Sequence, residues 1–202
     1  MELSRPLALI APTLDADVLT VLARADAEFT SGDIARLLQG PSTRGILNTL
    51  MRLTDQGIVS RRPAGRAHLY RLNRAHLAAP YIQSLVNIRQ ELVTKLSREV
   101  LGWSPQPIFG SLFGSAVRTD HGLTSDIDIF LVRPDTSRDQ EWEQHTDALS
   151  RLVTQWTGND ARILTMEQDY LASRGATEPV VTEILREGIT FIGDPQWIEA
   201  QT

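Results

Sequence analysis

Residues 107–133 read PIFGSLFGSAVRTDHGLTSDIDIFLVR, and this stretch decides the fold of the second half of the chain. It opens with an apolar strand that ends at Phe113-Gly114-Ser115, and it closes with a strand, residues 127–132, rich in β-branched and aromatic side chains. Because side chains alternate along a strand, Asp126 and Asp128 project from the same face. Two adjacent carboxylates repel each other, and a divalent cation bound between them removes that cost. Oxygen ligands suit Mg²⁺, so the stretch predicts a magnesium site held by Asp126 and Asp128.

The turn after the first strand has a chemistry that complements this pair. Gly114 allows the backbone to approach a phosphate closely, and the hydroxyl of Ser115 and the neighbouring N–H groups can donate hydrogen bonds to the phosphate oxygens. Arg118 follows three residues later and adds a charged fork for the same anion. The sequence therefore predicts that one half of the stretch binds a metal ion and that the other half binds a phosphate tail.

At these positions the chain resembles the nucleotidyltransferase superfamily of DNA polymerase beta, especially its minimal members from bacteria and archaea. The motif of that family begins with Gly-Ser, continues with Ala-Arg-Gly and closes with Ser-Asp-x-Asp at the start of the next strand. The matching residues of this chain are Gly114, Ser115, Arg118, Ser125, Asp126 and Asp128. Thr119 stands where the family has a glycine.

The resemblance covers about residues 85–195 and implies a small mixed sheet with flanking helices. It also implies a nucleoside triphosphate as ligand and Mg²⁺ as cofactor on Asp126 and Asp128. The activity that it implies is transfer of a nucleoside monophosphate to a hydroxyl acceptor, with release of pyrophosphate. The residues that would hold the nucleotide are Gly114, Ser115, Arg118 and Ser125.

Members of that family carry a third acidic residue on a later strand, where it completes the metal site. Here the matching position of the predicted strand 161–166 holds Arg162, and Asp160 lies two residues earlier. Three interpretations stay open: Asp160 is catalytic in a shifted register, Asp126 and Asp128 suffice for a slower or different transfer, or the domain binds a nucleotide or only keeps the fold without catalysis. Because a guanidinium opposes bound cations, Arg162 could instead contact a triphosphate in place of a second metal ion.

The first half of the chain has three segments of helical periodicity followed by a hairpin pattern. Two strand-like runs, 58–62 and 68–72, are joined by the short turn Pro63-Ala64-Gly65. This order of three helices and a β-hairpin resembles the winged helix-turn-helix family over residues 14–73. Asp15 and Ser42 are the expected N-caps of the first and third helices, and Thr30-Ser31-Gly32-Asp33 is the start signal of the second.

The third predicted helix carries a polar face. Arg44, Asn48 and Arg52 are spaced by four residues and so share one side of the helix, which Thr43 and Thr49 flank. Arg and Asn side chains can each make two hydrogen bonds to base edges in a major groove. The residues expected to face the core are Leu47, Leu50, Met51 and Leu53. We therefore predict that Thr43, Arg44, Asn48 and Arg52 contact DNA.

The predicted hairpin is basic as well. Arg61, Arg62 and Arg66 lie around its tip, where contacts to phosphate groups are expected if the hairpin acts as a wing. The segment 30–78 holds eight Arg against only Asp33 and Asp55, which is the charge pattern of a surface that binds a polyanion. The pattern favours double-stranded DNA as a partner, and a winged helix used only for protein contacts is the alternative.

The composition narrows the class of protein. The chain has 202 residues, 20 Lys and Arg against 25 Asp and Glu, a net charge of -5 and no cysteine. The absence of cysteine excludes a disulfide framework, a thiolate zinc site and a cysteine nucleophile. No apolar stretch is long enough to cross a bilayer, so we expect a cytoplasmic protein without a membrane partner.

The sequence thus predicts an α+β protein of two domains. Residues 1–78 form the winged helix-turn-helix domain, and residues 79–202 form the nucleotidyltransferase-like domain with a long connecting helix, 79–102. That helix could also pack against its twin in a homodimer. The leading hypothesis is a DNA-binding protein that transfers a nucleoside monophosphate with Mg²⁺. The alternative is a catalytically inactive transcriptional regulator whose second domain senses a nucleotide or mediates dimerisation.

Overall fold

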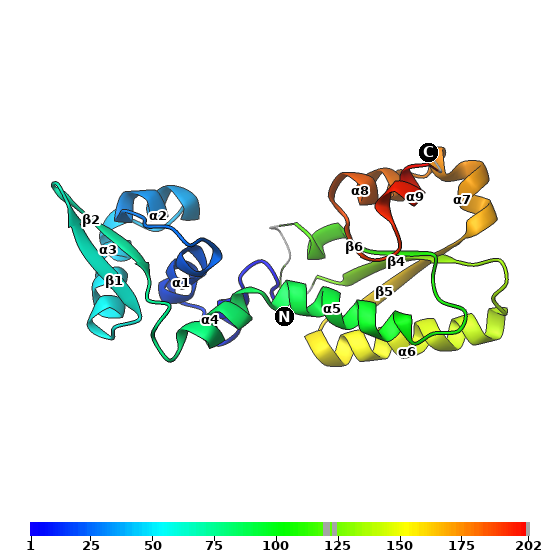
Figure 1. The fold of residues 1–202 in the computed structure, drawn as a ribbon, viewed down its shortest axis with the longest axis horizontal. Coiled ribbons are helices and arrows are strands. Elements are labelled where there is room, and N and C mark those ends of the chain that lie inside the picture. Colours follow the sequence, from blue (N-terminus) through cyan, green and yellow to red (C-terminus); the bar gives the residue numbers. More distant parts are fainter. Residues whose placement is uncertain (119–121, 123–124, 201–202) are drawn as a thin grey trace. The chain divides into compact units, whose positions relative to one another are not determined.

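The computed structural model describes residues 1–118, 122 and 125–200, and it divides into two compact units (Figure 1). The first unit consists of Ser4–Ile88 with Glu2, and the second consists of Arg89–Thr202 with Met1 and Leu3. Both contain helices and a small sheet, so the chain is a mixed α/β protein. Among the described residues, no helix combines the length and the apolar character that crossing a bilayer requires.

The first unit has three helices, an antiparallel hairpin and a fourth helix around one apolar core. Helix α2 begins with a capping box, in which Thr30 and Asp33 each accept a hydrogen bond from the backbone N–H of the other. Ser42 caps α3 by accepting from the N–H of Gly45 at 3.1 Å. The N-cap expected at Ser42 and the start signal that begins at Thr30 are therefore confirmed. The N-cap expected at Asp15 is wrong, because α1 begins at Leu14 and Thr13 precedes it. The elements are η1(Pro6–Leu9), α1(Leu14–Arg24), α2(Ser31–Leu38), α3(Thr43–Asp55), β1(Val59–Ala64), β2(Ala67–Leu72) and α4(Ala79–Val86).

Strands β1 and β2 pair in antiparallel register as far as Ala64 and Ala67, so Pro63 and Ala64 belong to β1 and not to the turn where they were expected. Tyr70 of β2 is buried, and its backbone exchanges hydrogen bonds of 2.9 and 2.8 Å with Phe29, which lies before α2. Leu50 and Leu53 of α3 are buried as expected. Thr49, expected beside the polar face, is buried as well, and Met51 is 47% exposed. The expectation for Met51 was wrong because a residue next to Leu50 lies about 100° further round the helix.

The expected single helix over residues 79–102 is wrong, because the chain forms two helices. Helix α4 ends at Val86, Asn87 leaves helical geometry, and α5(Ile88–Leu101) begins at the next residue. The apolar side of α4 joins the core of the first unit, with Ala79 and Val86 buried there. This packing moves the boundary between the units from residue 78 to residue 88.

The second unit contains a four-stranded sheet in the order β5-β4-β3-β6. Strand β3 is antiparallel to both β4 and β6, and β5 is parallel to β4, so the expected small mixed sheet with flanking helices is present. Helices α5 and α6 cover one face, and α7, α8 and α9 cover the other (Figure 1). The remaining elements are β3(Phe109–Phe113), η2(Gly114–Ala116), β4(Ile127–Arg133), α6(Asp139–Thr157), β5(Ala161–Glu167), α7(Gln168–Arg174), η3(Gly175–Thr177), α8(Pro179–Glu187), β6(Ile189–Ile192) and α9(Pro195–Glu199).

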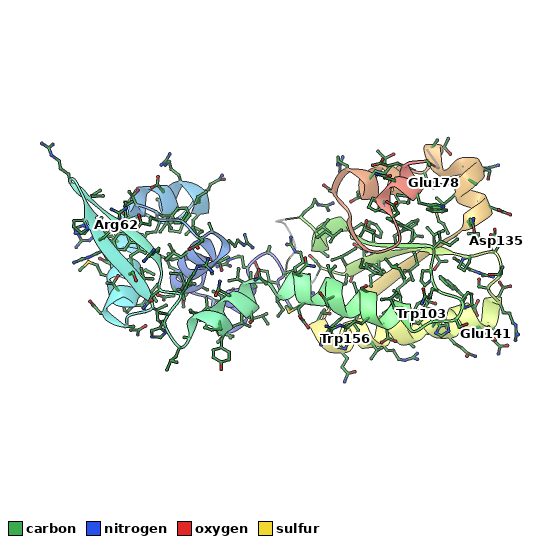
Figure 2. All side chains as sticks on the ribbon, viewed as in Figure 1. Arg62, Trp103, Asp135, Glu141, Trp156 and Glu178 are labelled. Carbon is green, nitrogen blue, oxygen red and sulfur yellow. The ribbon has the colours of Figure 1, made fainter. Side chains whose placement is uncertain are left out.

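The two faces of β4 differ in what they contact. Phe130 and Val132 belong to the apolar cluster that also contains residues of α7, α8 and α9. Because side chains alternate along a strand, Asp128 projects to the same side as Phe130, at the start of β4. On the opposite face, Trp103 stacks on His145 of α6 with ring centroids 4.8 Å apart and fixes the end of α5 to that helix (Figure 2). The fold thus places Asp128 at one end of the sheet, on the side of α8.

Candidate functional site

The two halves of the motif meet at Gly114 and Asp128. Phe113, the last residue of β3, is the register partner of Asp128. Gly114 follows with φ of +67°, a left-handed conformation that favours glycine. A Cβ atom at this position would lie 2.5 Å from Oδ2 of Asp128, which is closer than non-bonded atoms can approach. Only glycine therefore allows the backbone of this turn to lie against the carboxylate.

The carboxylate of Asp128 is half-buried and lacks hydrogen-bond donors. Among the residues that the structure describes, no N–H or O–H group donates a hydrogen bond to it. Burial raises the pKa of Asp128, and the negative charges of Asp126 and Glu183 raise it further. The guanidinium groups of Arg162 and Arg118 lower it, but burial is the largest effect. The site thus holds an acid whose charge is not fully compensated by the protein.

Arg162 occupies the position where the resemblance implies a third acid. It lies directly opposite Asp128 in the parallel pairing of β4 and β5. Its Nη2 atom lies 2.6 Å from Oδ2 of Asp126 and forms an ion pair with it. Asp160 precedes β5 and is exposed, and its backbone carbonyl accepts a hydrogen bond of 2.8 Å from the N–H of Ile127.

Arg118, the expected phosphate-binding fork, is held by two carboxylates of α8. Its Nη1 atom lies 2.9 Å from Oε1 of Glu183 and 3.0 Å from Oε1 of Glu187. The hydrogen bond that Arg118 donates to Glu187 is the main cause that lowers the pKa of Glu187. Arg89, at the start of α5, donates to the carbonyls of Val117 and Arg118 at 3.1 and 3.3 Å. The turn after Gly114 is therefore fastened to α5 and α8.

Ser125 stabilises the loop that leads into β4. Its hydroxyl accepts a hydrogen bond of 3.0 Å from the N–H of Gly122. Its carbonyl accepts one of 2.8 Å from the side-chain amide of Asn159, a buried residue just before β5. Ser115 lies in the η2 turn, whereas Thr119 lies outside the described residues.

Sequence reasoning missed three residues of this site. Glu183 and Glu187 are four residues apart and so share one side of α8, and this pair of acids was the available signal. Asn159 gave no signal, because its contact with Ser125 depends on how β5 lies beside β4.

The carboxylates of the site fit one divalent cation. The carboxylate of Asp128 is half-buried and accepts no hydrogen bond from a described residue. It lies in the space that a Cβ atom at Gly114 would fill, and Asp126 is close by along the chain. Mg²⁺ is commonly held by one or two carboxylates together with substrate phosphates. The set does not fit two cations, because the Arg162 guanidinium lies among the carboxylates. Within the described residues, no three His, Cys, Asp or Glu side chains gather to hold a metal, so the role of Asp160 stays a prediction.

In the first unit, the seven residues predicted to contact DNA differ in how they are held. All seven are exposed. Arg52 forms an ion pair with Asp15 of α1, and Arg62 forms one with Glu28, with Nε 2.8 Å from Oε1 (Figure 2). The side chains of the other five make no hydrogen bond or ion pair with any described residue, and these are Thr43, Arg44 and Asn48 on α3 and Arg61 and Arg66 on the hairpin.

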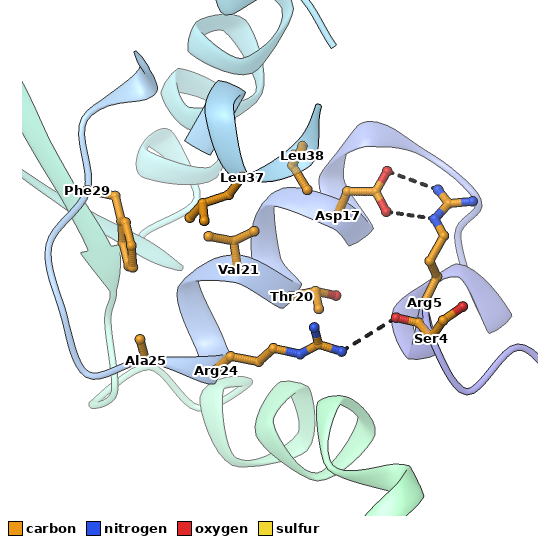
Figure 3. A pocket seen from close by; sticks show the side chains of 10 residues that line it. All are labelled: Ser4, Arg5, Asp17, Thr20, Val21, Arg24, Ala25, Phe29, Leu37 and Leu38. Atoms are coloured by element: carbon orange, nitrogen blue, oxygen red, sulfur yellow. Dashed lines mark hydrogen bonds and ion pairs between the residues drawn. The ribbon is translucent and has the colours of Figure 1, made fainter. Parts of the chain in front are cut away.

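The first unit also contains a cavity of about 470 Å³ between α1 and α2, which the sequence did not indicate (Figure 3). Its wall is mostly apolar and includes Val21, Phe29 and Leu37. At its edge Arg5 and Asp17 form a two-bonded ion pair with distances of 3.0 and 2.9 Å. The cavity is separate from the polar face of α3.

No protein-family model and no curated protein matches the chain. Among solved structures, the toxin–antitoxin MntA-HepT aligns with 55% of this chain and 79% of its own, at 21% identity and a TM-score of 0.37. A toxin–antitoxin structure with AMP-PNP aligns with 56% of this chain and 79% of its own, at 23% identity and a TM-score of 0.38. TrmBL2, an archaeal chromatin protein described as having a novel mode of DNA binding, aligns with 86% of this chain and 71% of its own, at 17% identity and a TM-score of 0.30. All three likenesses are weak.

Proposed function

We propose that this chain is a DNA-binding regulator whose second unit binds a nucleoside triphosphate together with one divalent cation. The observation that carries the proposal is the contact of the Gly114 backbone with the half-buried, donor-free carboxylate of Asp128. It joins a turn suited to phosphate with a carboxylate pair suited to Mg²⁺, in the order of the motif that the chain resembles. The ion pair of Arg162 with Asp126 favours nucleotide sensing over transfer, because it takes the place of a third carboxylate.

In this proposal each residue of the site has a separate task. Asp126 and Asp128 hold the cation, which when bound supplies positive charge for the polyphosphate. The Gly114 turn presents N–H groups and the hydroxyl of Ser115 to the phosphate oxygens. Arg118 donates a two-pronged hydrogen bond to the same anion, and the carboxylates of α8 hold it ready in the unliganded state.

The test of nucleotide binding uses the full chain and titration calorimetry with ATP and Mg²⁺. We expect binding to the wild type and to the control Asp147→Asn, a change of an exposed acid on α6, and loss of binding in Asp126→Asn/Asp128→Asn. Absence of metal-dependent ATP binding to the wild type would end this part of the proposal. Incubation with ATP labelled at its α-phosphate separates the two candidate functions, since transfer of label to an acceptor by the wild type alone would establish the transferase.

We further propose that the first unit binds double-stranded DNA, with α3 in the major groove and the hairpin on the backbone. What supports this is the exposed position of Arg44 and Asn48 on α3 without partners among the described residues. Side chains of this kind can turn to base edges without breaking a contact within the protein. Because Arg52 and Arg62 are engaged by carboxylates, we expect them to contribute less.

Selection of binding sites from random duplexes, followed by affinity measurements, tests the DNA proposal. We expect Arg44→Ala/Asn48→Ala to lose about tenfold or more in affinity for the selected site, since each two-bonded base contact contributes about 1–3 kcal/mol. The control Arg98→Ala/Gln90→Ala changes similar exposed residues on α5 and should bind normally. Equal affinity of the two variants would contradict the assignment of α3. A palindromic selected site would support a homodimer.

A further inference from the structure

Arg162 is the residue of the site whose position is least expected, because a positive charge lies among carboxylates suited to cations. From this arrangement we infer that Arg162 acts in place of a second divalent cation, so that the site binds a polyphosphate with one metal ion and retains weaker binding with none. The inference rests on the proposed nucleotide site, and it adds which groups compensate the negative charge of the polyphosphate and of the two aspartates. It predicts a metal stoichiometry and a metal-free binding mode.

The pairing of β4 and β5 brings Arg162 within reach of both aspartates. Arg162 is the register partner of Asp128, and its guanidinium reaches diagonally to Asp126 at 2.6 Å. Its charge also acts on Asp128, whose pKa it lowers against the opposing effect of burial. One guanidinium thus compensates part of the charge of both carboxylates, as a bound cation would.

The guanidinium is free to exchange partners. The side chain of Arg162 is 74% exposed, whereas that of Asp126 is only 24% exposed. Among the described residues, Asp126 is the one ion-pair partner that Arg162 has. An ion pair this exposed contributes little to stability. A polyphosphate offers several charged oxygens in a geometry that suits a guanidinium fork, so Arg162 can turn from Asp126 to the ligand.

The charges around the site account for one divalent cation and not two. Within the described residues, the side chains that act on this site are the carboxylates of Asp126, Asp128 and Glu183 and the guanidinium groups of Arg118 and Arg162. Glu183 already forms an ion pair with Arg118. When Arg162 turns to the phosphate, Asp126 and Asp128 are left to a single cation. A second cation would lie beside a guanidinium and be repelled.

The experiment measures Mn²⁺ and ATP on the full-length protein. Free Mn²⁺ is counted by electron paramagnetic resonance in saturating ATP, and fluorescently labelled ATP is titrated in excess chelator. In the first measurement, the wild type should bind one Mn²⁺ per chain in addition to the Mn²⁺ bound by free ATP. In the second, it should still bind ATP when excess chelator has removed the metal ions. Arg162→Gln should weaken the binding in chelator about tenfold or more, since it removes charge-assisted hydrogen bonds. The control Arg151→Gln removes an exposed arginine of α6 and should match the wild type.

A second variant tests the same inference in the opposite direction. Arg162→Asp places a third carboxylate opposite Asp128 and should raise the count from one Mn²⁺ to two. Circular dichroism melts establish that each variant is folded. If ATP binds the wild type only with Mn²⁺, and Arg162→Gln leaves this binding unchanged, the inference is overturned while the nucleotide site stands. If ATP does not bind under either condition, the proposed function fails and the inference fails with it.

Discussion

Two separate constraints require glycine at position 114. Its left-handed backbone would strain any residue with a Cβ atom, and the same Cβ atom would collide with Asp128. Gly158, the C-cap of α6, has a similar φ of +71° but no neighbour within 4 Å of its Cβ position. A substitution at Gly158 therefore measures the cost of the left-handed backbone alone, whereas one at Gly114 measures that cost together with the steric collision.

We expect Gly158→Ala to lower the free energy of unfolding by about 1–2 kcal/mol, the cost of the left-handed conformation alone. Gly114→Ala should lower it by about 1–3 kcal/mol more, because Asp128 must move away from the new methyl group. Urea unfolding of both variants measures the difference. Gly114→Ala should also lose Mg²⁺-dependent ATP binding, and Gly158→Ala should keep it. Equal unfolding free energies in the two variants would contradict the collision.

The pH dependence of stability should reveal Asp128. Because its pKa is raised in the folded protein, mainly by burial, the native state holds the proton more tightly than the unfolded chain does. Stability from this group is present below the unfolded pKa and is lost as the pH rises through the folded pKa. Asp128→Asn should therefore have a higher urea midpoint than the wild type at about pH 7, and the advantage should disappear at about pH 3.

The exposed acid of α6 provides the comparison for this measurement. Asp147→Asn should shift the urea midpoint little at either pH, because Asp147 is exposed to solvent. An Asp128→Asn variant that is less stable than the wild type near neutral pH would show that Arg162 and Arg118 outweigh burial.

At the scale of elements, the hairpin β1–β2 carries three arginines that differ in whether a carboxylate of the protein pairs with them. Arg61 and Arg66 have no partner among the described residues, whereas Arg62 is held by Glu28. We expect Arg61→Gln/Arg66→Gln to reduce the slope of log affinity against log salt by about two, since each lost phosphate contact removes about 0.9. Arg62→Gln should change the slope less. Fluorescence anisotropy with one duplex at several salt concentrations gives both slopes, and an equal change in the single variant would refute the distinction.

Local signals in the sequence predicted the elements well where short-range chemistry decides them. Thr30 and Ser42 cap their helices, and the turn at Gly65 joins the expected strands. The break at Asn87 was missed because the apolar pattern continues across it, whereas the first unit ends at Ile88. Which unit a helix packs against is a tertiary property that periodicity does not contain.

The candidate site was also predicted only in part, because short-range spacing places some of its residues and tertiary packing places the others. Gly114, Asp126 and Asp128 are linked by short spacing and by adjacent strands, so the motif was sufficient to place them together. The partners of Arg118 were not predictable, because Glu183 and Glu187 lie 65 and 69 residues away along the chain. The phosphate-binding role of Arg118 stays a prediction, and the packing of α8 sets the carboxylates that this arginine contacts in the structure.

At the scale of the whole molecule, each unit has its own apolar core. Ile46 is fully buried in the first unit and Ile129 is fully buried in the second. Separate cores predict separate cooperative transitions. We expect calorimetry to resolve two transitions, with Ile46→Ala lowering one and Ile129→Ala lowering the other, each by about 2–5 kcal/mol of unfolding free energy.

Ligands then assign the transitions independently of the substitutions. ATP with Mg²⁺ should raise only the transition that Ile129→Ala lowers, because a ligand stabilises the unit that binds it. A single transition that both substitutions shift equally would show that the two cores unfold together.

The outermost place of β5 in the sheet gives Arg162 one more consequence. Among the described residues, β5 pairs with β4 alone, so its other border offers backbone groups to which a strand from another copy could add. Leu164, 38% exposed, lies on that strand two residues after Arg162. A charged side chain beside such a leucine discourages intermolecular strand addition, since the incoming chain would have to desolvate it. We therefore expect Arg162→Leu to increase association between copies of the chain, which static light scattering would measure.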